Sequence, residues 1–114
     1  EYMNTQIIAV EPAESPVMSG GEKGLHGIQG IGDGSKFLVD LDKVDEVITI
    51  STEEAKDRSL RLARENGLFV GISSGANIYA AQKITSLEEN YGKNIVTILC
   101  DTGERYLSSG LYDS

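Results

Sequence analysis

The chain has 114 residues, of which 39% are hydrophobic and 25% are charged, as is ordinary for one soluble globular domain. Its formal net charge of −8 argues against a general surface for nucleic acid or anionic membranes. No apolar stretch approaches the roughly 18 residues of a membrane span. No secretory leader is visible, and the single cysteine, Cys100, excludes an internal disulfide, so we expect a cytoplasmic protein.

The first predicted element is a strand from Thr5 to Val10, because its second half is a continuous apolar run. Pro12 is expected to end this strand, since proline cannot donate to a β-ladder. The two acidic residues that follow, Glu11 and Glu14, are expected to be solvated rather than catalytic.

A glycine-rich loop follows from Ser19 to Ser35, and it requires unusual backbone angles or close approach to another group. It matches neither the G-x-G-x-x-G pattern nor a P-loop, because Ser35 stands where each pattern needs glycine. His26, the only histidine, is expected to bond to the loop backbone rather than to act as an acid or base. One histidine and one cysteine predict no metal centre.

Residues Asp45 to Ile50 are rich in β-branched side chains and are predicted to form a second strand. Ser51 and Glu54 have the spacing of a capping box, which predicts a helix that continues to about Asn66. Gly67 is then well placed to terminate that helix. The expected buried stripe of this helix is Ala55, Ser59, Leu62 and Ala63.

The stretch from Gly71 to Asn77 follows a short apolar run and precedes a helical pattern that continues to Leu87. Ser73 and Ser74 are predicted to cap this helix, with Ala76 and Asn77 as its first residues. Small residues, hydroxyls and a helix N-terminus together suit a ligand that is polar or has a ring nitrogen. The alternative is a plain serine-capped helix without a ligand.

Residues Ile95 to Cys100 are predicted to form a third strand, buried and central in a parallel sheet. Cys100 at its end is expected to be a small buried apolar residue. Strands that alternate with helices imply an α/β fold, in which ligands sit at the carboxyl ends of the strands. Asp101 and Thr102 fall at such an end.

Four blocks of the chain, in order, resemble the C-terminal part of the cysteine synthase (O-acetylserine sulfhydrylase) family. They are Val10–Pro16, His26–Gly32, Gly67–Asn77 and Ile98–Ser108. The resemblance implies an α/β fold, an incomplete three-layer parallel-sheet part of the large domain of a fold-type II, tryptophan-synthase-β-like enzyme. Residues 1–114 would be the C-terminal portion of that domain, and the half that carries the Schiff-base lysine would lie outside the chain.

The same resemblance implies pyridoxal 5'-phosphate as the cofactor. It gives Ser73 the role of holding the pyridine nitrogen, with Asp101 and Thr102 close to the pyridine edge. The residues implied to line the substrate and cofactor region are Gln29, Gly30, Ile31 and Gly32. A neutral hydroxyl at the nitrogen makes the ring a weaker electron sink than an aspartate would, which suits β-elimination.

The implied reaction is β-replacement on O-acetylserine, or a related activated serine, with sulfide to give L-cysteine through an aminoacrylate. The intact enzyme is expected to be a homodimer, and this chain alone is expected to be inactive. Sister enzymes stay open as alternatives: cystathionine β-synthase, an O-phosphoserine sulfhydrylase or a serine/threonine dehydratase. The sequences of residues 29–32 and 103–106 favour a sulfhydrylase over the other sister enzymes. An alternative of another class is a non-catalytic binding or assembly module built on the loop around His26.

Two further features of the family have counterparts in this sequence. Lys56-Asp57-Arg58 has the letters of the Schiff-base lysine motif, but its place within a predicted helix indicates an exposed, solvated lysine, which is a poor nucleophile. In some family members basic residues near the glycine-rich loop hold the C-terminal tail of serine acetyltransferase. The matching positions here are Glu22, His26 and Gly27, and because only His26 can carry positive charge, they argue against this partner.

Overall fold

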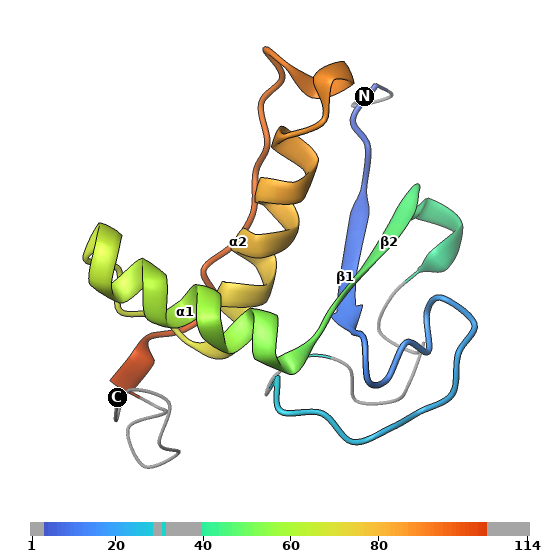
Figure 1. Cartoon of the computed structure of the whole chain (residues 1–114). Coiled ribbons are helices and arrows are strands. Elements are labelled where there is room, and N and C mark those ends of the chain that lie inside the picture. The colour runs from blue at the N-terminus through green and yellow to red at the C-terminus, as the bar shows by residue number, and fades with distance from the viewer. Residues whose placement is uncertain (1–3, 29–30, 32–39, 105–114) are drawn as a thin grey trace.

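The computed structural model describes residues 4–28, 31 and 40–104 and has an α/β arrangement, as predicted. Two strands, β1 and β2, lie beside two helices, α1 and α2 (Figure 1). Their bounds are β1 Ile8–Pro12, β2 Glu46–Ile50, α1 Thr52–Asn66 and α2 Ile72–Thr85, with short 3-10 helices at Leu41–Lys43 and Glu88–Asn90. The predicted helix at 52–66 and the second strand are thereby confirmed.

Strands β1 and β2 pair in parallel, with Ile8 opposite Glu46 and Pro12 opposite Ile50. The first strand begins three residues later than predicted, and it includes Pro12 instead of stopping before it. A proline is tolerated there because its nitrogen faces away from β2. The next residue, Ala13, donates its N–H to the Ile50 carbonyl at 2.9 Å and so continues the pairing with β2.

Helix α1 has the predicted capping box at its start. The Ser51 hydroxyl accepts from the Glu54 N–H at 3.1 Å, and the Glu54 carboxylate accepts from the Ser51 N–H at 2.9 Å. The helix ends at Gly67, which adopts a left-handed conformation with φ of 69°. Of the predicted stripe, Ala55, Ser59 and Leu62 are buried and Ala63 is half-buried.

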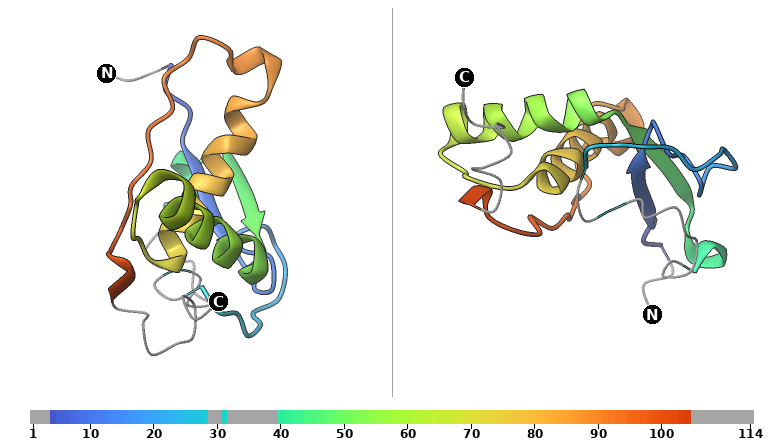
Figure 2. Two further views of the ribbon diagram at one scale, coloured as in Figure 1. Left: turned by 60° about the vertical axis from the view of Figure 1, so that its left-hand side comes forward. Right: turned by 90° about the horizontal axis from the view of Figure 1, so that it is seen from below.

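Helices α1 and α2 cross closely, and the core lies between them and the sheet (Figures 1 and 2). Gly75 lies where the two helices are in close contact. A Cβ atom added there would collide with the Ala55 carbonyl and the Ser59 hydroxyl, so Gly75 serves helix packing. The buried core residues are Ile28, Ile50, Ala55, Ile72, Ala76 and Ala80.

The prediction of a buried third strand at 95–100 was wrong. In the described part of the chain these residues are extended but belong to no sheet, and Val96 and Ile98 are 89% and 69% exposed. The segment lies along α2, where the Asn77 amide donates to the Ile98 carbonyl at 3.0 Å. A strand needs a neighbouring strand for its ladder, and β1 does not lie close enough to provide one. For the same reason Cys100 is exposed, not buried as predicted.

The expectation that Glu11 is solvated was also wrong, because its side chain is only 1% exposed. Its carboxylate accepts from the N–H groups of Met18 and Ser19, at 2.7 and 2.9 Å, and from the Ser19 hydroxyl. Glu11 thereby holds the turn that starts the glycine-rich loop. Glu14 is exposed, as predicted, and accepts from the Thr52 N–H at 2.9 Å at the start of α1.

Among the residues that the structure describes, no helix is long and apolar enough to cross a membrane. Within the same residues, histidine, cysteine, aspartate and glutamate side chains form no group of three that could hold a metal ion.

The capping box makes stability depend on pH. The backbone hydrogen bond from Ser51, followed by a side-chain hydrogen bond from Tyr79, lowers the pKa of Glu54 below its ordinary value of 4.5. A lowered pKa stabilises the folded state above 4.5, and this stabilisation is lost as the pH falls through the folded pKa. We expect Glu54→Gln, which keeps the cap geometry, to flatten the pH dependence of unfolding free energy below about pH 4.5 in urea titrations. An unchanged slope would contradict this.

Candidate functional site

The N-terminus of α2 meets the segment that follows the extended residues 95–100. The Gly71 N–H donates to the Asp101 carbonyl at 3.2 Å, and Val70 pairs with Thr102 in an isolated antiparallel bridge. The Gly103 N–H donates to the Phe69 carbonyl at 3.0 Å. These bonds bring the backbone of residues 101–102 against the first turn of the helix that carries Ser73, so two predicted parts of the site are adjacent.

The two serines lie within the first turn of α2 and do not cap it. Gly71 is the N-cap residue and the helix begins at Ile72, so the predicted serine caps and the predicted start at Ala76 were wrong. The Gly71 carbonyl accepts from the Gly75 N–H at 3.2 Å and from the Ser59 hydroxyl at 2.9 Å. Packing against α1, a contact distant in sequence, therefore fixes the start of the helix.

The two serine side chains have different partners. The Ser74 hydroxyl is fully buried and accepts from the Cys100 N–H at 3.0 Å, so it holds the extended segment in place. Ser73 is 3% exposed as a residue, and its hydroxyl has no hydrogen-bond partner within residues 4–28, 31 and 40–104. A nearly buried hydroxyl without a partner has a donor and an acceptor available for a ligand.

The electrostatic environment of the first turn of α2 favours a ligand with a polar ring. The first turn of a helix has N–H groups without intrahelical partners and carries a partial positive charge. Asp101 is half-buried, and its backbone carbonyl is bonded to the same end of α2. Because the Ser73 hydroxyl is small and neutral, it can donate to a ring nitrogen without transferring a full charge to it. These residues fit the nitrogen edge of the pyridine ring that the family resemblance implies.

The loop that leads to the other predicted site residues is attached to the start of α1. The Gly27 N–H donates to the Thr52 hydroxyl at 2.9 Å, and the Ile28 N–H donates to His26 Nδ1 at 3.1 Å. The prediction that His26 bonds to the loop backbone is confirmed. Ile31 is half-buried and packs against the core. The other three predicted lining residues, Gln29, Gly30 and Gly32, lie outside the described residues.

Sequence reasoning missed two residues that shape the site. Asn77 was interpreted only as a helix start, yet its amide holds the extended segment through Ile98, as described above. Ser59 was placed in a buried stripe, yet its hydroxyl bridges α1 to the Gly71 carbonyl. The signal available for Ser59 was a polar residue on an otherwise apolar helix face. Lys56 is exposed on α1, as predicted.

Residues 1–101 match the family described as "Pyridoxal-phosphate dependent enzyme". The chain belongs to the pyridoxal-phosphate dependent enzyme family. This assignment agrees with the small, neutral hydroxyl at the N-terminus of α2 and with the α/β arrangement of the chain.

Individual members of the pyridoxal-phosphate dependent family are similar to this chain over nearly its whole length. A cysteine synthase of Staphylococcus aureus is 47% identical over 116 residues, which cover 98% of this chain and 36% of the relative. The crystal structure of a cysteine synthase (OASS) of Entamoeba histolytica has 46% identity and a TM-score of 0.92, covering 96% of this chain and 32% of the other.

A third family member is named for a different activity. The structure of an O-acetylserine dependent cystathionine beta-synthase of Helicobacter pylori has 42% identity and a TM-score of 0.77, covering 94% of this chain and 35% of that chain. In each comparison the match includes nearly the whole chain, whereas the chain spans about a third of the length of the relatives.

Proposed function

We propose that these residues are the C-terminal portion of the cofactor-binding large domain of a cysteine synthase. The intact protein would catalyse pyridoxal-phosphate-dependent β-replacement on O-acetylserine, or a related activated serine, with sulfide to give L-cysteine. The observation that carries this proposal is the Ser73 hydroxyl, nearly buried in the first turn of α2 and without a partner among the described residues. The similarity to cysteine synthases over nearly the whole chain supports it.

Ser73 would bind the cofactor at the edge of its ring. When bound, pyridoxal phosphate supplies an electron sink for the departure of the substrate's Cα proton and β leaving group. The Ser73 hydroxyl would keep its own proton and donate it in a hydrogen bond to the pyridine nitrogen. Because that nitrogen then carries no full positive charge, the withdrawal of electrons stays moderate and favours elimination over fuller carbanion chemistry.

The neighbouring residues would orient Ser73 and enclose the substrate. Asp101 and Thr102 are held against the start of α2 by backbone bonds, so their side chains would support the hydroxyl from one side. Residues 29–32 would line the substrate region; they follow Gly27 and Ile28, whose N–H groups are bonded to Thr52 and His26. The proposed partners are a small amino-acid substrate, sulfide and a second copy of the intact protein, in the cytoplasm.

In a second candidate function the substrate is the same activated serine, but the nucleophile is different. The similarity to an O-acetylserine dependent cystathionine beta-synthase favours it, because the same elimination would precede attack by a larger thiol. The two candidates are distinguished by offering sulfide or homocysteine as the nucleophile. Cysteine formation with sulfide alone supports the first candidate, whereas a strong preference for homocysteine supports the second.

The test requires an intact enzyme. We would replace the matching third of the Staphylococcus aureus cysteine synthase with residues 1–114 of this chain, since the two are 47% identical there. The chimera is expected to bind pyridoxal phosphate and to form cysteine from O-acetylserine and sulfide. A folded chimera that binds the cofactor but forms neither cysteine nor cystathionine would overturn the proposed function.

Within that chimera, Ser73→Ala is expected to lower kcat by about 10- to 100-fold, a loss of the size found when a group that orients a metal ligand is removed. The visible absorbance of the bound cofactor should change as well, which a merely structural defect would not explain. Thr85→Ala is the matched control, because it removes an exposed hydroxyl from the last turn of the same helix. Equal activities of the two variants would contradict the role given to Ser73.

A further inference from the structure

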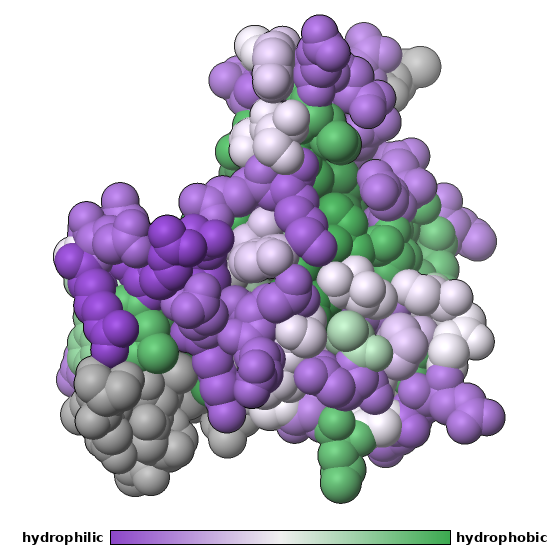
Figure 3. Space-filling model, viewed as in Figure 1, coloured by the Kyte–Doolittle hydropathy of each residue, from purple (hydrophilic) through white to green (hydrophobic). Residues whose placement is uncertain are grey.

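Helix α1 carries two hydroxyl side chains on the face that packs against the rest of the molecule. Thr52 is its first residue and Ser59 lies two turns further along, so the two share one face of the helix. Ala55 and Leu62, both buried, belong to the same face. The outward face is exposed to solvent, and Figure 3 shows a largely hydrophilic surface over α1. Thr52 and Ser59 are therefore placed to bond to the segments that pack on α1.

Thr52 holds the backbone of the glycine-rich loop. Its hydroxyl accepts from the Gly27 N–H at 2.9 Å. The contact is close, because a Cβ atom added to Gly27 would lie 2.7 Å from the Thr52 methyl group. The next residue, Ile28, is fully buried, and Ile31 packs against the same core. Thr52 therefore fixes the loop immediately before the loop enters the core.

Thr52 is itself held in place by the segment that follows β1. Its backbone N–H, which has no partner within the helix, donates to the two carboxylate oxygens of Glu14 at 2.9 and 3.2 Å. The adjacent Ser15 hydroxyl accepts from the Gly24 N–H at 3.1 Å. The loop is thus bonded to residue 15 at Gly24 and to α1 at Gly27, and Glu14 connects the two attachments.

Ser59 holds the start of α2 in a similar way. Its hydroxyl is fully buried and donates its single proton to the Gly71 carbonyl, at 2.9 Å, or to the Ala55 carbonyl, at 3.0 Å. Gly71 is the N-cap residue of α2, and its N–H donates to the Asp101 carbonyl at 3.2 Å. Both backbone groups of Gly71 are therefore bonded, one to α1 and one to residue 101. Ser73 lies two residues further along the same turn.

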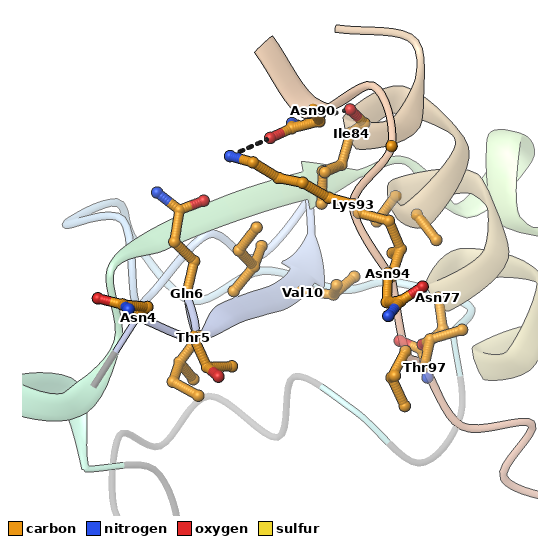
Figure 4. Close-up of a pocket in the computed structure, with 17 residues that line it drawn as sticks. Asn4, Thr5, Gln6, Val10, Asn77, Ile84, Asn90, Lys93, Asn94 and Thr97 are labelled. Carbon is orange, nitrogen blue, oxygen red and sulfur yellow. Dashed lines mark hydrogen bonds between the residues drawn. The ribbon is translucent and has the colours of Figure 1, made fainter. Parts of the chain in front are cut away.

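The contacts of α1 lie on a different face of α2 from an open cavity of about 690 Å³. This cavity is formed by β1, α2 and residues 93–97 (Figure 4). None of the described residues that line it belongs to α1, and its lining from α2 is Asn77, Ala80, Ala81 and Ile84. The bonds of Thr52 and Ser59 therefore do not depend on what occupies the cavity.

We propose that α1 fixes the position of the substrate loop relative to the cofactor, with Thr52 and Ser59 as the two positioning residues. This inference rests on the proposed function, in which residues 29–32 line the substrate region and Ser73 binds the ring nitrogen. Thr52 acts on substrate binding, because it holds the loop at Gly27. Ser59 acts on cofactor binding, because it holds the turn that carries Ser73. The two attachments stay roughly 10 Å apart along the axis, the rise of two helical turns.

The test of Thr52 uses the chimera with the Staphylococcus aureus cysteine synthase. Thr52→Val removes the hydroxyl and keeps the shape of the side chain. It is expected to raise the KM for O-acetylserine by about three- to tenfold, with the affinity for pyridoxal phosphate unchanged. Hydrogen exchange at the Gly27 amide should become faster by a similar factor, as measured by mass spectrometry. Thr52→Ser keeps the hydroxyl and should restore both values.

The test of Ser59 measures the cofactor. Ser59→Ala is expected to weaken the binding of pyridoxal phosphate to the apo-chimera by about three- to tenfold and to shift the visible absorbance of the bound cofactor. Exchange at the Gly27 amide should not change. Ser15→Ala is the matched control, because it also removes a buried hydroxyl, but one that bonds to Gly24 instead of α2. If circular dichroism shows that Ser59→Ala does not fold, Ser59→Cys, whose thiol is a weak donor, replaces it.

The division of effects between the two readouts decides the proposal. The chimera without these substitutions tests the proposed function separately, through its products. If it forms none, the affinity for O-acetylserine, followed by the cofactor absorbance, takes the place of KM. The proposal is overturned if Thr52→Val leaves substrate binding and Gly27 exchange unchanged, or if Ser59→Ala leaves cofactor binding and absorbance unchanged. It is also overturned if both variants weaken substrate and cofactor binding equally, since a general loss of structure would then explain them.

Discussion

Gly75→Ala is expected to lower the free energy of unfolding by about 2 kcal/mol, although alanine is the better helix former. In an unconstrained helix interior the same change would stabilise by about 0.5–1 kcal/mol. Here the new methyl group would collide with the Ala55 carbonyl and the Ser59 hydroxyl. One of these atoms belongs to the backbone of α1 and cannot move aside alone, so the two helices must separate. Urea denaturation followed by circular dichroism measures the change.

The matched control for this prediction is Gln82→Ala on the exposed face of the same helix. It adds no atom to the helix interface, so its effect is expected to stay within about 0.5 kcal/mol. A more stable Gly75→Ala variant would show that α1 and α2 are not in close contact at this point. In the chimera, the same variant should weaken cofactor binding, because separating the helices moves the first turn that carries Ser73.

The parts of the fold that were predicted correctly depend on interactions within a few residues. Ser51 and Glu54 bond to one another across one helical turn, and Gly67 ends the helix through its own backbone conformation. These signals are complete in the local sequence. The strand at 46–50 was also predicted, because its β-branched residues suit a pleated surface wherever a neighbour is present.

The parts that were predicted wrongly depend on distant partners. Residues 95–100 have the composition of a central strand, but composition supplies no neighbouring strand, and the structure leaves them without one. The start of α2 was placed at the serines because serine is a good cap. Packing against Ser59, twelve residues earlier than Gly71, moves the cap to a glycine.

The candidate site was predicted through resemblance more than through local pattern. A serine in the first turn of a helix is common, and only the ordered blocks of similar sequence distinguished Ser73 from Ser74. The structure separates them by their bonds, since Ser74 is committed to Cys100 whereas Ser73 is not. Asp101 and Thr102 were expected at the end of a strand. They reach the same place through backbone bonds to residues 70 and 71.

Glu11→Gln is expected to lower the free energy of unfolding by about 2 kcal/mol, although the two side chains have almost the same shape. Both carboxylate oxygens accept hydrogen bonds in the folded protein, one from the Met18 N–H and the other from Ser19. An amide has a single oxygen, so in either orientation its NH₂ group faces a backbone N–H. In one orientation the Met18 N–H loses its acceptor, and in the other the Ser19 N–H keeps only the Pro16 carbonyl at 3.2 Å. The lost bonds cost about 1–3 kcal/mol, and relief of the buried charge offsets part of the loss.

Three variants separate the effect of the buried carboxylate from that of charge alone. Ser19→Ala removes one of the bonds to Glu11 and should cost less than Glu11→Gln, about 1 kcal/mol. Glu14→Gln, three residues away and exposed, removes the same charge and should cost less than about 1 kcal/mol. Faster proteolysis within residues 16–24 should accompany Glu11→Gln but not Glu14→Gln, because the Glu11 carboxylate bonds to Met18 and Ser19 whereas the Glu14 carboxylate bonds to Thr52. Equal losses from Glu11→Gln and Glu14→Gln would mean that net charge, not the bonds to Met18 and Ser19, determines the contribution of Glu11.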